Sequence, residues 1–221
     1  MSGRLLAISD IHGCYKTFYE LLNIVGLNQS DELVILGDMI NRGSDSKSVL
    51  KTIIKLKKSG YNIKCIRGNH EQMLLDVIEK DPLNLYRFLK TYHSENLLNL
   101  KGEIKKKFVN FLNELPYYYS TDEYIFVHAA LDLTLEDIFS DKTFMLFSRY
   151  QKGNTKALNG KRLIHGHVAS NLEIIKNNFF DNTPILGIDN GCVHKNSKPG
   201  LGKLVCIDFT NKEIFAKENC D

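Results

Sequence analysis

Five short clusters of polar and ionisable residues each follow an apolar run of the chain. They are Asp10-Ile11-His12-Gly13, Gly37-Asp38 with Arg42-Gly43 after three intervening residues, Gly68-Asn69-His70-Glu71, Val127-His128-Ala129 and His165-Gly166-His167. Together they supply carboxylates, an amide and several imidazoles. Oxygen and nitrogen ligands in this mixture suit Mn²⁺, Fe²⁺ or Zn²⁺, whereas Ca²⁺ sites use oxygen almost throughout. The clusters therefore predict a site for divalent metal ions.

No cluster is specific when it is taken alone. An Asp after a strand is commonly a turn or N-cap residue, and Asn69 by itself indicates a turn. A histidine such as His128, after an apolar run, is commonly a hydrogen-bonded core residue. Five such clusters, each at the end of a predicted strand, are hard to explain as independent turns, so the joint pattern favours the metal site.

The first three clusters follow the strands of a predicted α/β unit. Apolar runs at 5–8, 33–36 and 63–66 predict buried strands, and helical patterns separate them. This alternation predicts a parallel sheet with right-handed crossovers. Since open α/β sheets bind ligands beyond the carboxyl ends of their strands, the first three clusters are expected to meet at one edge.

The rest of the chain predicts a helical middle followed by a second group of strands. Helices are expected at 82–92 and around 104–115, and Gly26 is expected to help end the first helix of the chain. The later strands, interpreted as a second sheet packed on the first, are predicted at 124–127, 163–164, 172–175, 185–188 and 204–207. We expect a single domain over residues 1–221 with a helical insertion around 81–115, which is either a cap over the site or a simple insertion.

Bulk properties restrict the functional class. The net charge of +3 is too small to predict a nucleic-acid partner, and no apolar run is long enough to predict a membrane span. The chain has five cysteines without a CxxC pair, and its first strand leaves no room for a signal peptide. We therefore expect reduced thiols and a cytoplasmic location, and the oligomeric state stays open.

The order and spacing of the clusters resemble the motif set of the phosphoprotein phosphatase family, the serine/threonine protein phosphatase branch of the calcineurin-like metallophosphoesterases. The likeness runs from Leu5 to about Asp208 and is nearest to small bacterial members and to the symmetrical diadenosine tetraphosphatases. It implies an α/β fold of two mixed β-sheets sandwiched between helices (αββα). It also implies two divalent metal ions, with Mn²⁺ favoured and Fe²⁺ or Zn²⁺ as alternatives. The matching metal ligands are Asp10, His12, Asp38, Asn69, His128 and His167.

The resemblance also implies a catalytic role for several residues. Asp38 would bridge both metals, and a water between the metals would lose a proton near neutral pH and attack phosphorus. Arg42 and Arg149 match the arginines that bind phosphate, since a guanidinium pairs with phosphate bidentately. His70 matches the general acid for the leaving group. His165 is an alternative ligand, although the family pattern, with its ligand directly after the glycine, favours the other histidine of that cluster.

Asn41 departs from the pattern of many protein phosphatases, which carry an Asp there beside the catalytic histidine. An amide can accept a hydrogen bond from the His70 ring, but it offers no charge to stabilise an imidazolium. We therefore expect His70 to be a weaker acid here, which favours a nucleotide phosphate leaving group over an alkoxide. Glu71 is expected to support local hydrogen bonds.

The leading hypothesis is a metal-dependent phosphatase that hydrolyses phosphomonoesters, either phosphoserine and phosphothreonine proteins or aryl phosphates. The alternative is a symmetrical diadenosine tetraphosphate (dinucleoside polyphosphate) hydrolase. A hypothesis from another class, a metal-binding pseudoenzyme or adaptor, rests on Asn41 alone. The expected partners are a phosphorylated protein or a small phosphoester, with no nucleic acid and no membrane.

Overall fold

Alternating burial along the strands divides the molecule into layers. In the computed structural model, which describes residues 3–195 and 197–221, Ala7 packs in one core cluster while Leu6 and Ile8 pack in another. Phe126, from a strand of the second sheet, joins Ala7 in the shared cluster. Because successive strand residues point to opposite faces, the two sheets face each other across this shared core.

The order of elements follows the expected alternation in the first third of the chain. Among the described residues, the strands are β1 (Leu5–Ile8), β2 (Glu32–Ile35), β3 (Asn62–Cys65), β4 (Tyr118–Ser120), β5 (Tyr124–Val127), β6 (Asp132–Leu133), β7 (Lys152–Gly153), β8 (Arg162–His165), β9 (Ile185–Gly187), β10 (Lys203–Asp208) and β11 (Glu213–Glu218). The α-helices are α1 (Tyr15–Val25), α2 (Ser46–Lys58), α3 (Asn69–Lys80), α4 (Leu85–Thr91), α5 (Lys106–Asn113), α6 (Lys142–Phe147) and α7 (Leu172–Phe180). Short 3-10 helices are η1 (Pro82–Asn84), η2 (Glu95–Leu97), η3 (Thr155–Leu158) and η4 (Cys192–His194).

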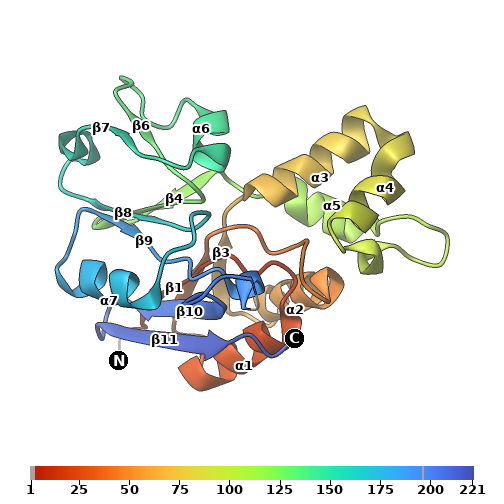
Figure 1. Cartoon of the computed structure of the whole chain (residues 1–221), viewed down its shortest axis with the longest axis horizontal. Helices are drawn as coiled ribbons and strands as arrows, with labels where there is room; N and C mark the ends of the chain where they lie inside the picture. The colour runs from red at the N-terminus through yellow and green to blue at the C-terminus, as the bar shows by residue number, and fades with distance from the viewer. Residues whose placement is uncertain (1–2, 196) are drawn as a thin grey trace.

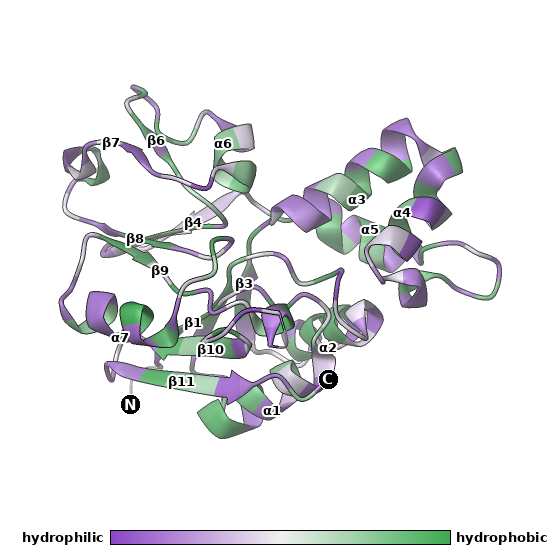
Figure 2. Cartoon of the chain, viewed as in Figure 1, coloured by the Kyte–Doolittle hydropathy of each residue, from purple (hydrophilic) through white to green (hydrophobic). Residues whose placement is uncertain are grey.

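Two mixed sheets form the centre of the fold (Figure 1). The first has the strand order β11-β10-β1-β2-β3, in which β1, β2 and β3 are parallel, as predicted, and β10 is antiparallel to β1. The second has the order β4-β5-β8-β9, with β5, β8 and β9 parallel. Strands β1 and β10 are mainly hydrophobic, whereas the edge strand β11 carries hydrophilic residues at its ends (Figure 2). This arrangement agrees with the predicted αββα class.

Two details of the predicted strands are wrong. Residues 172–175 begin helix α7, because Asn171 caps it by accepting from the Glu173 N–H at 2.9 Å. Ile175 and Phe179, one helical turn apart, are both buried on its inner side. Residues 204–207 do form a strand, β10, but it pairs with β1 in the first sheet and not in the second.

Helices α3, α4 and α5 form a lobe beside the first sheet (Figure 1). Leu89, Phe108 and Leu112 of this lobe are fully buried and belong to the same core cluster as Leu6. This continuity supports our proposal of one domain with a helical insertion at 81–115. The lobe matters for function because the turn after α4 reaches the polar residues that follow β2.

Other expectations concern helix ends, thiols and membranes. Gly26 ends α1 in a left-handed conformation with φ of 60°, as its position predicted. All five cysteines are free thiols. Within residues 3–195 and 197–221, none of the helices has the length and apolarity needed to cross a membrane.

Candidate metal centre and active site

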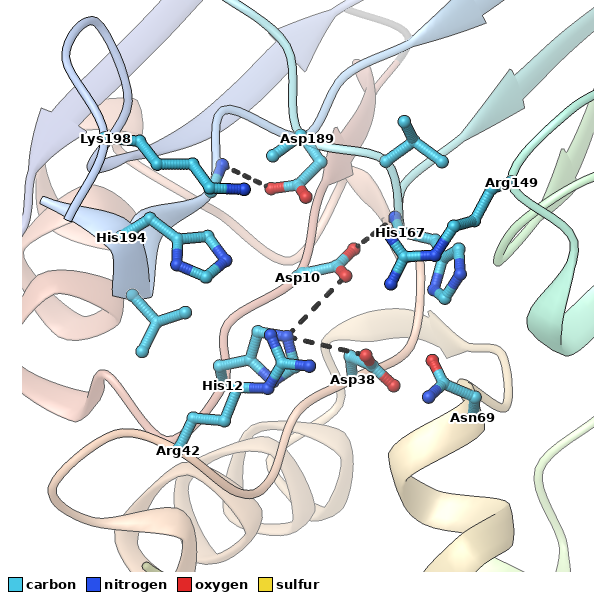
Figure 3. Close-up of a pocket in the computed structure, with 14 residues that line it drawn as sticks. Asp10, His12, Asp38, Arg42, Asn69, Arg149, His167, Asp189, His194 and Lys198 are labelled. Carbon is cyan, nitrogen blue, oxygen red and sulfur yellow. Dashed lines mark hydrogen bonds and ion pairs between the residues drawn. The ribbon is translucent and has the colours of Figure 1, made fainter. Parts of the chain in front are cut away.

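The polar clusters come together at one cleft, which lies at the carboxyl ends of the parallel strands in both sheets (Figure 3). Asp10 and His12 follow β1, Asp38 follows β2, and Asn69 follows β3. Across the cleft, the second sheet contributes the residues after β5 and β8. Of the ten residues predicted for the site, those that line the cleft are Asp10, His12, Asp38, Arg42, Asn69, Arg149 and His167. Parallel strands therefore bring together side chains that are far apart in sequence.

Several of these residues have a strained backbone. Left-handed φ values occur at His12 (48°), Asp38 (45°), Asn41 (72°), Arg42 (71°) and His167 (63°). For residues other than glycine, such a conformation costs about 1–3 kcal/mol and persists only where the surroundings enforce it. The chain uses this strain to turn side chains into the cleft directly after a strand.

Asp38 lies between two groups of potential ligand atoms. One group comprises Asp38, His12 and His70, and the other comprises Asp38, His128 and His167; within each, the atoms lie within 4.8 Å of one another. Asp38 Oδ2 is 3.5 Å from His12 Nε2, and Asp38 Oδ1 is 3.6 Å from His128 Nε2. One carboxylate thus presents a different oxygen to each group, as a bridging ligand of a two-metal site would.

The surroundings of His128 fit a bound cation. Its Nδ1 donates to the Leu36 carbonyl at 2.8 Å, so Nε2 of the neutral ring carries no proton. That Nε2 lies 2.9 Å from Asn69 Oδ1 and 3.1 Å from His167 Nδ1, while the Asn69 amide nitrogen points to Met73 Sδ. Burial, and next His167, lower the pKa of His128 far below its usual value, which opposes a second proton. Lone pairs facing each other in this way are stabilised by a metal ion between them.

Asp10 lies beside the first group of potential ligands. Its Oδ1 accepts from the His167 N–H at 3.0 Å, and its Oδ2 lies 3.9 Å from His12 Nε2. Burial, followed by the charges of Asp189 and Asp38, raises the pKa of Asp10 well above its usual value. A dication in the site would restore the charged form. Gly166 allows this approach, because a Cβ there would lie 2.2 Å from Asp10 Oδ1.

Glu71 holds the loop that carries Asp38. Its two oxygens accept four backbone N–H groups, from Asp38 at 2.8 Å, Met39 at 2.8 Å, Gly68 at 2.9 Å and Ile40 at 3.3 Å. The side chain is fully buried. This agrees with the expected structural role, since the carboxylate satisfies amides that would otherwise be unpaired in the core.

Asn41 contacts His70, and a hydrogen bond from Ser94 determines which atom of the Asn41 amide faces the His70 ring. Asn41 Nδ2 lies 2.9 Å from His70 Nδ1, and the Ser94 hydroxyl donates to Asn41 Oδ1. The sequence led us to expect the amide to accept from His70. In the structure it donates, because its oxygen is already engaged by Ser94. Burial, and next Arg42, lower the pKa of His70 to about 3. A neutral His70 then carries its proton on Nε2.

The structure distinguishes between His165 and His167 as candidate metal ligands. His165 Nδ1 contacts the Gly166 carbonyl at 3.0 Å, and its ring packs against Gly187, where a Cβ would lie 2.9 Å from the ring. It does not line the cleft, whereas His167 does. The geometry therefore favours His167 as the ligand, with His165 as a structural neighbour.

Arg42 and Arg149 present free guanidinium groups to the cleft. Both are exposed, and across residues 3–195 and 197–221 neither guanidinium has a hydrogen bond or ion pair. By contrast, Arg67 and Arg162 donate to backbone carbonyls and are held in place. Unpaired guanidinium groups beside a metal-ligand cluster are suited to binding phosphoryl oxygens.

Sequence reasoning did not assign a role to three further residues of the cleft, Asp189, His194 and Lys198. Asp189 is buried, accepts from the Gly191 N–H at 2.6 Å, and has its pKa raised by burial to about 6. A signal was present, because Asp189 also follows a strand, β9. His194 and Lys198 follow no such pattern, and only the path of the chain brings them to the cleft.

The strand-end ligands and their shared carboxylate agree with the comparison to known proteins. The profile of the calcineurin-like phosphoesterase family matches residues 3–182. The chain belongs to this family. It is a metallophosphoesterase, and the expected divalent metals accord with both the family and the ligand groups.

Curated relatives of this metallophosphoesterase share part of its length. A symmetrical bis(5'-nucleosyl)-tetraphosphatase from Nitrosomonas europaea is 32% identical over 162 residues, which cover 67% of this chain and 57% of the relative. A protein of the same name from Nitrosospira multiformis is 32% identical over 129 residues, covering 58% of this chain and 43% of the relative. The chain thus spans about half the length of the curated relatives it matches.

Solved structures with the same fold are more distant in sequence. A provisionally assigned diadenosine tetraphosphatase has a TM-score of 0.68 and 21% identity, with 100% of this metallophosphoesterase and 96% of the other chain covered. A serine/threonine phosphatase from Saccharomyces cerevisiae has a TM-score of 0.63 and 16% identity, with 100% and 81% covered. These similarities show the shared fold.

The site supports phosphoester hydrolysis through groups of the chain around the metals. Divalent metal ions held by the ligand groups would supply a nucleophile near neutral pH and would neutralise charge on the phosphoryl group. Arg42 and Arg149 are free to bind the remaining phosphoryl oxygens. His70, with Nδ1 facing the Asn41 amide, can donate from Nε2, and Glu71 keeps the Asp38 loop fixed.

Proposed function

We propose that this metallophosphoesterase hydrolyses dinucleoside polyphosphates symmetrically, so that diadenosine tetraphosphate and water give two molecules of ADP. Water adds across the central P–O–P linkage, one P–O bond breaks, and the leaving group is a nucleoside diphosphate. The proposed metal ligands are Asp10, His12, Asp38, Asn69, His128 and His167, with Mn²⁺ as the preferred ion.

The observation that carries this proposal is the partner of His70. Asn41 offers an N–H to His70 Nδ1, where a carboxylate would stabilise an imidazolium. Transfer of a proton to an alkoxide is therefore poorly supported. A nucleotide phosphate needs less protonation than an alkoxide when it leaves, because the second pKa of a phosphate group is only about 6. The printed names of the curated relatives agree with this choice.

The other two hypotheses have weaker support. A phosphoprotein substrate, our leading expectation from the sequence, has the same phosphoester chemistry, but no curated relative reported above carries such a name. The adaptor hypothesis rested on Asn41, and that residue is hydrogen-bonded to His70, which lies in one of the two groups of potential ligands.

A substrate panel tests the proposal. The purified chain is assayed with diadenosine tetraphosphate, a phosphoserine peptide and p-nitrophenyl phosphate, each with Mn²⁺, Fe²⁺ or Zn²⁺. We expect ADP as the sole nucleotide product. We expect kcat/KM for the dinucleotide to exceed that for the peptide by about 100-fold, the lower range of what a positioned proton donor contributes. A higher kcat/KM for the peptide would reverse the choice of substrate.

Two variants that each remove one negative charge form a matched pair, with one change inside the site and the control outside it. Asp38→Asn should abolish turnover of all three substrates, since Asp38 lies in both ligand groups. Asp122→Asn changes an exposed carboxylate in the turn before β5 and should leave turnover unchanged. Turnover retained at the wild-type level in Asp38→Asn would contradict the role of Asp38 as a ligand of both groups.

A further inference from the structure

Residues 191–195 and 197–202, part of the connection between β9 and β10, contribute Gly191, Val193, His194 and Lys198 to one wall of the cleft (Figure 3). In Figure 3, the side chains of His194 and Lys198 lie on one side of Asp10, and Arg149 lies on the other. All of these side chains line the cleft. The cleft therefore has cationic and donor groups on two opposite sides of the metal ligands.

This wall is held by backbone and amide hydrogen bonds. Asn190 Nδ2 donates to the Gly200 carbonyl at 3.0 Å, and Asn190 Oδ1 accepts from the Lys203 N–H at 3.1 Å. Within the segment, the Lys198 N–H donates to the His194 carbonyl at 3.2 Å. One buried amide thus fixes the end of the segment to the start of β10, and the backbone presents both side chains to the cleft.

The donors of His194 and Lys198 are available to a ligand. Over the described parts of the chain, 3–195 and 197–221, neither Lys198 Nζ nor His194 Nε2 has a hydrogen-bond partner. His194 Nδ1 contacts the Ser197 hydroxyl at 3.3 Å, which leaves Nε2 for another group. Lys195 differs, because its Nζ donates to the Asn219 carbonyl at 2.8 Å and it is not among the residues that line the cleft.

His194 also lies near Arg42. Burial is the main cause that lowers the pKa of His194, and the charges of Arg42 and Lys198 follow as its neighbours. The neutral imidazole N–H and the ammonium on this wall, and the guanidinium of Arg42 near the imidazole, are all donors, so they suit phosphoryl oxygens. The single phosphoryl group of a monoester would be bound by the metals, Arg42 and Arg149, and would leave Lys198 unused.

We propose that Lys198 and His194 form a subsite for the phosphoryl group adjacent to the one that is cleaved. The proposal rests on the proposed function, because only a polyphosphate chain offers a second phosphoryl group to this wall. The subsite would make the phosphoesterase select phosphoanhydrides over phosphomonoesters.

Nucleotide binding tests the subsite independently of turnover. Calorimetry compares ADP, which has two phosphoryl groups, with AMP, which has one, on the Mn²⁺-loaded protein. We expect ADP to bind about tenfold more tightly, the lower range for a charge-assisted hydrogen bond. The Lys198→Ala variant should lose most of this preference, and His194→Ala should lose part of it. Lys195→Ala removes the same charge from the same segment and should keep it.

The same variants separate this inference from the proposed function. For Lys198→Ala, we expect kcat/KM to fall about tenfold with diadenosine tetraphosphate and to stay unchanged with p-nitrophenyl phosphate. If the wild-type chain does not cleave the dinucleotide, the proposed function fails, and the ratio of ADP to AMP affinity still decides the subsite. The subsite would be overturned if the ratio of ADP affinity to AMP affinity were the same in the wild type and in Lys198→Ala, provided that circular dichroism shows both proteins to be folded.

Discussion

Replacing Glu71 by glutamine tests how the loop carrying Asp38 is held. Each oxygen of Glu71 accepts two backbone N–H groups: Oε1 those of Met39 and Ile40, and Oε2 those of Asp38 and Gly68. Glutamine has nearly the same shape but only one oxygen. In Glu71→Gln, two buried N–H donors therefore face an NH₂ group and lose their acceptor.

The expected loss of stability follows from that count. A buried donor left without an acceptor costs about 1–3 kcal/mol, so two donors cost about 2–6 kcal/mol. Domains of this kind have a total free energy of unfolding of about 5–15 kcal/mol. The variant should therefore fold but be markedly less stable, and displacement of Asp38 should weaken metal binding as well.

Urea unfolding followed by circular dichroism measures the free energy of unfolding. Glu79→Gln is the matched control, because Glu79 is exposed on the same helix and should change stability by no more than about 0.5 kcal/mol. A loss below about 1 kcal/mol in Glu71→Gln would refute the reasoning. It would mean that Glu71 is already protonated in the fold, where a neutral carboxyl group and an amide are near equivalents.

Three further changes probe the centre of the site. Asp38→Asn should lower the Mn²⁺ content measured by elemental analysis and reduce kcat by more than about 100-fold, beyond the usual effect of a ligand's outer partner; retention of both ions would exclude the bridging role. Asn41→Asp places a carboxylate beside His70, whose pKa now lies at about 3, and should raise that pKa by about 1–3 units. The imidazolium form should then persist to higher pH, so activity on the phosphoserine peptide, whose alkoxide leaving group needs a proton, should extend to higher pH, and an unmoved pH–rate profile on that peptide would contradict the pairing. Ser94→Ala frees the Asn41 amide to rotate and should lower kcat about threefold to tenfold at constant KM, as expected for one neutral hydrogen bond; a rise in KM alone would point to a different role.

The local sequence pattern was sufficient to predict the parallel strands of the first sheet and the candidate metal ligands that follow them. The runs at 5–8, 33–36 and 63–66 became β1, β2 and β3 to within a residue or two, because buried parallel strands need continuous apolar residues. Asp10, Asp38 and the residues around them then meet for a geometrical reason, since neighbouring parallel strands end at one edge.

The sequence pattern gave a wrong prediction where a short segment was compatible with two structures. Residues 172–175 read equally as strand or helix over four positions, and burial of Phe179 beneath the second sheet and capping by Asn171 decide for the helix. Strand β10 could pair with either sheet, and its register with β1 is a long-range contact that four apolar residues do not encode.

The residue types at the strand ends, and with them the kinds of atoms that the chain can offer to a divalent metal ion, are determined by the sequence itself. Which atoms face one another is decided by tertiary structure. The hydroxyl of Ser94 turns the Asn41 amide toward His70, and the segment after β9 brings Lys198 to the cleft. The Ser94–Asn41 contact joins residues 53 positions apart and the Asn41–His70 contact residues 29 positions apart, and only the packed fold fixes such distances.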